Sequence, residues 1–208
     1  MVVGRTIEKI AGTVLAGGRG RRLGGNKPMH FFQGRPLIEH VIGRLDDQVD
    51  ALWLSAGANC GDLVRLGRPI ITDAPQYADH GPIAGIEASL THAASNGFNY
   101  VAIVPCDAPF LMPELIAELS RSLRRSEAPA IIASTSRGIQ PAFGLWSVEG
   151  VGTARAALNA GRWDLHSLCE QLQVAVWECR ANGYSEEPFL NINSSADIAE
   201  AEDLYATA

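Results

Sequence analysis

Short apolar runs alternate with longer amphipathic runs along the chain, and this alternation predicts repeated β-α-β units. We expect strands at 12–16, 51–54, 69–72 and 100–104, with further candidates at 130–133, 141–146 and 174–177. We expect helices from Pro36, over 83–94, from Pro113, over 151–159, over 165–172 and from Ser194 to about Tyr205. Such units favour an α/β fold in which helices cover both faces of a mostly parallel, twisted sheet.

Size and composition fit one globular domain over residues 1–208. Apolar residues make up 47% of the chain and charged residues 19%. Domains of roughly 150 residues are usual, and no linker or repeat divides this chain. Seventeen basic and twenty-three acidic residues leave a net charge of -6, which argues against a nucleic-acid partner.

The first residues and the cysteines favour a cytoplasmic protein. Acidic and basic residues stand together near the start, which is not typical of a secretory signal. No stretch approaches the roughly 18 apolar residues of a membrane span, so we expect no membrane partner. The four cysteines lack the two-residue spacing of a zinc knuckle, and we expect reduced thiols.

A glycine-rich segment after the first strand carries the strongest chemical signal. Residues 15–28 read Leu-Ala-Gly-Gly-Arg-Gly-Arg-Arg-Leu-Gly-Gly-Asn-Lys-Pro. Glycines let the backbone approach a ligand closely, so that free N–H groups can face anionic oxygens. The segment also carries four cations, which are Arg19, Arg21, Arg22 and Lys27. It therefore indicates a site for a nucleoside polyphosphate.

Two common phosphate-binding motifs do not fit this segment. A dinucleotide fingerprint that begins at Gly18 needs a glycine where Leu23 stands. A Walker A motif that begins at Gly20 needs a lysine where Asn26 stands. The segment thus favours neither a Rossmann dehydrogenase nor a P-loop NTPase.

Polar side chains at predicted strand ends supply further candidates. Asp107 follows the strand at 100–104, where its carboxylate could bind Mg²⁺, with Mn²⁺ as an alternative. Asp73 ends the strand at 69–72, where it is a ligand contact or a turn residue. Asn191 and Asn193 flank Ile192, and in a strand both amides would point to one face.

These segments together resemble the molybdenum cofactor guanylyltransferases, a family of nucleotidyltransferases that act on NTPs. The glycine-rich segment is typical of the whole superfamily. Gly-Pro-Ile-Ala-Gly at 81–85, Pro-Cys-Asp at 105–107 and Asn-Ile-Asn at 191–193 are more specific. The resemblance implies a single Rossmann-like domain that transfers GMP from GTP to the phosphate of molybdopterin and releases pyrophosphate.

The resemblance also implies roles for individual residues. Nucleotide contacts would come from the half at about 12–110, namely Leu15, Ala16, Gly17, Gly18, Lys27, Asp73, Gly81, Pro82, Gly85 and Asp107. Lys27 and Arg22 would place positive charge on phosphates, and Asp107 would hold the metal. Acceptor contacts would come from the half at about 111–208, namely Asn191, Asn193 and Arg162. The structural alternatives are solvated loop cations, tight turns and helix caps.

The chain departs from the family pattern at several positions. Asn59 is displaced from the place expected near the base, which leaves base recognition open. Around Arg162 the family's paired arginines are replaced, and Trp163 there either stacks on a pterin ring or belongs to the core. His166 is expected at the surface. A CTP-dependent relative, a nucleotide-sugar synthase and a non-catalytic binding module are the alternatives.

We expect a monomer, although the sequence does not itself show the oligomeric state. Contacts with cofactor-delivery chaperones or with molybdoenzymes are expected to be transient, since no large exposed amphipathic stretch is evident.

Overall fold

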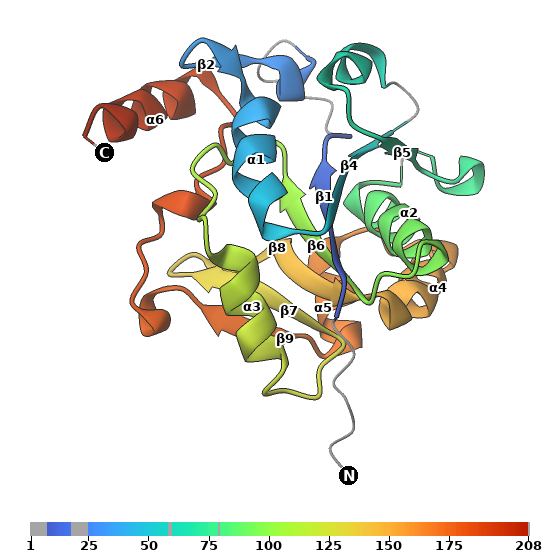
Figure 1. Cartoon of the computed structure of the whole chain (residues 1–208). Helices are drawn as coiled ribbons and strands as arrows, with labels where there is room; N and C mark the ends of the chain where they lie inside the picture. The colour runs from blue at the N-terminus through green and yellow to red at the C-terminus, as the bar shows by residue number, and fades with distance from the viewer. Residues whose placement is uncertain (1–7, 18–24, 58–59, 79, 208) are drawn as a thin grey trace.

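The computed structural model describes residues 8–17, 25–57, 60–78 and 80–207. Within these ranges a seven-stranded sheet has the order β5-β4-β1-β6-β8-β7-β9, and helices lie on both of its faces (Figure 1). The strands are β1 (Ile10–Leu15), β4 (Ala51–Ala56), β5 (Ile70–Thr72), β6 (Tyr100–Pro105), β7 (Ala130–Thr135), β8 (Gly138–Ser147) and β9 (Ala175–Glu178).

The sheet is mostly parallel, as the sequence predicts. β1 pairs in parallel with both β4 and β6, and β5 extends this half beyond β4. β8 runs antiparallel to both β6 and β7, because it follows β7 through a tight hairpin turn. β9 then pairs in parallel with β7 at the edge.

Six helices lie in the described part of the chain, close to the predicted positions. They are α1 (Leu37–Leu45), α2 (Pro82–Ser95), α3 (Leu115–Leu123), α4 (Val151–Asn159), α5 (Leu165–Leu172) and α6 (Ser195–Thr207). Pro36 ends the short strand β3 (Arg35–Pro36), which pairs with β2 (Phe31–Phe32), and α1 begins one residue later. Pro113 precedes α3 by two residues. None of the helices described is long and apolar enough to cross a membrane.

The sheet is buried on both faces, which explains the continuous apolar runs of its strands. Val14, Leu54 and Val104 point toward α1 and α3 and form one core with them. Val101 and Ile103 point toward α2, α4 and α5 and belong to the opposite core. Because side chains alternate along a strand, each central strand supplies both cores.

A third, smaller core joins the C-terminal segment to the β2–β3 hairpin. It contains Phe32, Leu37, Leu190, Ile192 and Ala201, all of which are buried. Fully burying one such aliphatic side chain contributes roughly 1.5–3 kcal/mol. This core therefore holds residues near 190 beside the hairpin that follows Lys27.

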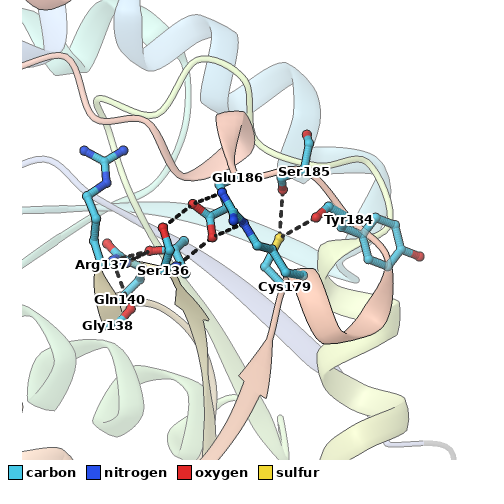
Figure 2. A network of polar contacts seen from close by, with 10 residues as sticks. Ser136, Arg137, Gly138, Gln140, Cys179, Tyr184, Ser185 and Glu186 are labelled. Carbon is cyan, nitrogen blue, oxygen red and sulfur yellow. Dashed lines mark hydrogen bonds and ion pairs between the residues drawn. The ribbon is translucent and has the colours of Figure 1, made fainter.

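Two polar arrangements also fix the C-terminal segment. The Oγ of Ser194 accepts from the N–H of Asp197, whose carboxylate accepts from the N–H of Ser194, so the pair forms a capping box at α6. The carboxylate of Glu186 accepts from the N–H and the hydroxyl of Ser136 in the β7–β8 turn, at 2.6 and 2.8 Å (Figure 2). Both ends of segment 186–194 are thus held by the rest of the fold.

Candidate active site

A cavity of about 620 Å³ opens where the parallel strands end. The strand ends contribute Leu15, Ser55, Asp73, Pro105, Cys106 and Asp107 to its wall. The start of α2 contributes Gly81, Pro82 and Gly85, and Lys27 also lines it. This is the usual place for a ligand in an open α/β sheet, because the strand-to-helix loops converge there.

Lys27 contacts two polar side chains that the sequence analysis singles out at distant positions. Its ammonium group donates to the carboxylate of Asp107 and to Oδ1 of Asn193, the latter at 2.5 Å. The side chains of Lys27 and Asp107 are only 14% and 8% exposed. The partly buried, charge-assisted contact between Lys27 and Asp107 is stronger than a contact between neutral groups at the surface.

The backbone around Asp107 explains why these groups meet. The carbonyl of Asp107 accepts from the N–H of Ile192 at 2.9 Å, and the N–H of Cys106 donates to Leu15. The side chain of Ile192 is fully buried in the third core. The end of β6 is therefore joined to β1 on one side and to the C-terminal segment on the other.

Residues 191–193 do not form a strand, so the argument from strand alternation does not apply to Asn191 and Asn193. This segment has no regular secondary structure, because its neighbours are a backbone carbonyl, the third core and the start of α6 rather than another strand. Asn193 contacts Lys27, whereas the side-chain oxygen of Asn191 is buried and has no hydrogen-bond partner. The two amides have different surroundings, which strand alternation did not anticipate.

The first turn of α2 lies against the end of β4. Gly81 has φ 72°, which favours glycine, and Pro82 follows at the first helical position. A Cβ atom on Gly85 would lie 2.6 Å from Oγ of Ser55. Gly85 therefore lets the helix start approach the cavity closely, where its free N–H groups suit an anion.

Of the remaining candidates for the nucleotide site, some line the cavity and others do not. Asp73 lies at the cavity wall close to Gly57, and Gly17 also lines the cavity. Ala16 is buried, and its N–H donates to the carbonyl of Ser55 at 2.7 Å, so it holds the neighbouring strands together. Gly18, Arg19, Arg21, Arg22 and Asn59 lie outside the described residues.

Cys106 is a packing residue, as expected from its sequence context. It is 4% exposed and belongs to the core that contains α1 and α3. Burial raises the pKa of its thiol far above the usual range, so the group stays neutral. All four cysteines are free thiols.

Arg162 does not reach the cavity. Its guanidinium group is exposed and donates to Oε1 of Gln171 on α5 at 3.2 Å. The neighbouring Trp163 and His166 line a second cavity instead, and Trp163 is 48% exposed, so it is not a core residue. His166 is exposed, as predicted.

Sequence reasoning missed several wall residues of the first cavity. Ser55 could have been found, because it ends a predicted strand on the same sheet edge. Ala142 and Leu165 belong to none of the recognised motifs, and the packing of β8 and α5 brings them to the wall.

The oxygen atoms that face Lys27 are of the kind that binds a divalent cation. They are the carboxylate oxygen of Asp107 and the amide oxygen of Asn193, and both already accept from the ammonium group. Among the residues described, no cluster of three or more His, Cys, Asp or Glu could hold a metal alone. Mg²⁺ commonly binds through one or two carboxylates with phosphate oxygens completing its shell, and Asp107 fits that pattern.

Comparison with known proteins agrees with the resemblance seen in the motifs. A molybdenum cofactor guanylyltransferase from Nitrobacter hamburgensis is 34% identical over 96% of this chain and 96% of its own length. One from Rhizobium leguminosarum bv. trifolii is 36% identical over 96% and 94%.

A solved structure shares the fold. Molybdopterin-guanine dinucleotide biosynthesis protein A from Archaeoglobus fulgidus superposes with a TM-score of 0.80 at 23% identity, covering 95% of this chain and 100% of that one. Residues 12–176 match the family model described as the MobA-like NTP transferase domain. With relatives above 30% identity along almost its whole length, the chain belongs to the family of MobA-like NTP transferases.

Proposed function

We propose that this protein transfers GMP from GTP to the phosphate of molybdopterin and releases pyrophosphate. The observation that carries the proposal is the meeting of Lys27, Asp107 and Asn193 at the strand-end cavity. Relatives that are 34–36% identical over nearly their full length are named molybdenum cofactor guanylyltransferases. The cavity, at about 620 Å³, is large enough for a nucleotide.

The nucleotide is proposed to lie against the half of the domain at about 12–110. Leu15, Gly17, Asp73, Gly81 and Gly85 line the cavity there, and the start of α2 offers backbone N–H groups. Arg22 and Gly18 are proposed to join them from the glycine-rich segment. Asn193, from the half at about 111–208, is proposed to face the phosphate of the acceptor.

The reaction needs two anions to approach each other. A phosphate oxygen of molybdopterin attacks the α-phosphorus of GTP, one P–O bond forms, and the bond to the departing pyrophosphate breaks. Lys27 provides positive charge close to both groups, which lowers their repulsion and stabilises the charge that develops. Bound through Asp107, Mg²⁺ or Mn²⁺ would supply further charge neutralisation.

Binding measurements with four nucleotides test the proposal. Calorimetry with GTP, CTP, ATP and UTP, each with Mg²⁺ and then with excess chelator, should give tight binding for GTP with the metal only. Incubation with GTP and molybdopterin should then yield the guanine dinucleotide and pyrophosphate. Preference for CTP, or transfer to a sugar phosphate, would instead indicate the alternative nucleotidyltransferase functions.

The cellular setting follows from the same proposal. Free thiols at all four cysteines fit a reducing cytoplasm, where GTP is also found. We propose a monomer whose contacts with chaperones or molybdoenzymes are transient.

A further inference from the structure

Asn26, the residue before Lys27, has a backbone conformation that residues with a side chain rarely adopt. Its φ is 47° and its ψ is 44°, which is the left-handed region. Among residues other than glycine, asparagine is one of the few that tolerate this region. An unusual backbone conformation directly beside a site residue points to a role in placing that residue.

This conformation brings the chain into a short 3-10 helix, η2 (Lys27–Met29), of which Lys27 is the first residue. The carbonyl of Asn26 accepts from the N–H of Met29 at 3.0 Å, and the carbonyl of Lys27 accepts from the N–H of His30 at 3.1 Å. Pro28, the second residue of η2, is buried. The backbone that follows Lys27 is therefore fixed, and Asn26 is the residue at which the chain turns into it.

The side chain of Asn26 does not cap η2 but reaches another segment of the chain. Its Nδ2 donates to Oδ2 of Asp62 at 2.9 Å. Asp62 lies on the 3-10 helix η4 (Gly61–Leu66), whose Leu63 is buried in the core that contains α1 and α3. Asp62 is thus an anchored partner, and its carboxylate makes this contact stronger than one between two neutral groups.

Lys27 is consequently held at both of its ends. Its ammonium group contacts Asp107 and Asn193 at the cavity, whereas its backbone follows the contact between Asn26 and Asp62. An ammonium group on a flexible four-carbon stem is poorly fixed without such a backbone support. A displacement of about 1 Å at a reacting centre can cost about 100-fold in rate, so this support has consequences for the reaction.

We infer that Asn26 is a positioning residue that fixes the backbone of Lys27, with Asp62 as its anchor. Asn26 and Asp62 are not among the described residues that line the cavity, so both act through Lys27. The inference rests on the proposed function for what Lys27 does, and it deepens that proposal by naming what holds Lys27 in place.

The first test measures the position of Lys27 without any nucleotide. Lys9 and Lys27 are the two lysines of the sequence, and Lys9 is exposed, so it serves as an internal standard. Acetic anhydride is added to the intact protein, and mass spectrometry of peptides gives the ratio of the acetylation rates of Lys27 and Lys9.

Two substitutions break the contact from opposite sides. Asn26→Gly keeps the left-handed conformation and removes the side chain, whereas Asp62→Ala removes the acceptor. Each should raise the ratio about fivefold, as for the loss of one hydrogen bond, because Lys27 leaves its partners more often. The double variant should raise the ratio no further, because both changes remove the same contact.

Two further variants are the controls. Asp62→Asn keeps an oxygen acceptor for Asn26, and it should give a ratio close to that of the wild type. Arg65→Met removes the other partner of Asp62, an exposed arginine at 3.4 Å from Oδ1, and it should leave the ratio unchanged. The melting temperatures of Asn26→Gly and Asp62→Ala should differ from the wild type no more than that of Arg65→Met.

The transfer of GMP gives a second, independent measurement. Asn26→Gly and Asp62→Ala should each lower kcat about fivefold, since the charge of Lys27 is less well placed in the transition state. In a protein that already carries Lys27→Met, Asn26→Gly should lower kcat no further. A role of Asn26 in general stability would instead lower kcat in both backgrounds.

Several results would overturn the inference. They are an unchanged acetylation ratio in Asp62→Ala, an equal rise in Arg65→Met, or additive effects of Asn26→Gly and Asp62→Ala. Failure of the proposed function is a different result, in which the wild type transfers no GMP to molybdopterin. The acetylation ratios decide the inference in that case too, because they need no nucleotide.

Discussion

Lys27 and Asp107, eighty positions apart in the chain, form an ion pair at the wall of the strand-end cavity. The ammonium group of Lys27 therefore neutralises the carboxylate that is proposed to hold Mg²⁺. A triphosphate offers Lys27 alternative partners and brings its own oxygens to the metal.

Metal binding should consequently depend on nucleotide. Mn²⁺, followed by electron paramagnetic resonance, should bind the free protein at least tenfold more weakly than the protein with GTP. Lys27→Met should tighten Mn²⁺ binding in the absence of GTP, because Asp107 loses its competing cation. Arg68→Met, which breaks the separate ion pair with Asp46, is the matched control. Equal Mn²⁺ affinity with and without GTP in the wild type would contradict this expectation.

Removing the charge of Asp107 should affect turnover more than nucleotide affinity. We expect Asp107→Asn to lower kcat by about 100-fold or more, as for the loss of a group that stabilises charge in the transition state. Steady-state rates and calorimetry with GTP separate the two effects. Asp46→Asn, at an ion pair away from the cavity, should change neither. A variant with normal kcat would remove Asp107 from the proposed metal site.

Gly85 should tolerate no side chain while Ser55 keeps its hydroxyl. The added Cβ of Gly85→Ala would meet Oγ of the buried Ser55, and such overpacking typically costs about 1–3 kcal/mol. Urea unfolding measures the loss. The double variant with Ser55→Ala should recover part of it, and strict additivity of the two changes would show that the contact is not the cause.

A buried carboxylate joins α2 to α4. Glu87 is 3% exposed, and its Oε1 accepts from Nε of Arg155 at 2.6 Å and from the hydroxyl of Thr91 at 2.9 Å. Arg155→Met should lower the free energy of unfolding by about 2 kcal/mol, less than for a fully buried pair because Arg155 is half exposed.

Two comparison variants isolate the role of this carboxylate. Adding Glu87→Gln to Arg155→Met should restore part of the lost stability, because the buried charge is gone. Arg65→Met breaks an exposed ion pair with Asp62, and it should change the free energy of unfolding by at most about 0.5 kcal/mol. A similar loss in both single arginine variants would argue against a special role for burial.

His40 should make stability depend on pH. Burial lowers the pKa of His40 below its usual value of 6.5, with Arg35 and Arg44 acting in the same direction. Its Nε2–H donates to the carbonyl of Phe32 at 2.8 Å. Below pH 6.5 the unfolded chain binds a proton that the folded protein resists, so stability should fall as the pH falls toward the folded pKa.

The slope of this effect can reach about 1.4 kcal/mol per pH unit for one proton. Urea unfolding between pH 7 and pH 5 measures it. His40→Gln should flatten the profile, whereas His166→Gln, at an exposed position, should leave it steep. An unchanged profile in His40→Gln would assign the pH dependence to another group.

The local pattern of apolar and polar residues was enough to predict most of the secondary structure. The apolar runs at 12–16, 51–54 and 100–104 become β1, β4 and β6, because a strand buried on both faces must be apolar throughout. Asp107 was recognisable as a site residue for a related reason, since it directly follows such a strand.

The pattern of apolar residues does not predict the direction in which β8 runs. An antiparallel strand buried on both faces has the same apolar composition as a parallel one. Only its hairpin with β7 and its pairing with β6 decide the direction.

The sequence by itself determined the fold class, the family and the candidacy of Lys27, Asp107 and Asn193. The tertiary structure alone decided that Asn193 meets Lys27, 166 positions away, and that Trp163 rather than Arg162 faces a cavity. The physical reason is that these contacts depend on the third core and the His80–Trp163 contact, which join segments remote in sequence. Periodicity and motif spacing carry information only about residues that are close together in the sequence.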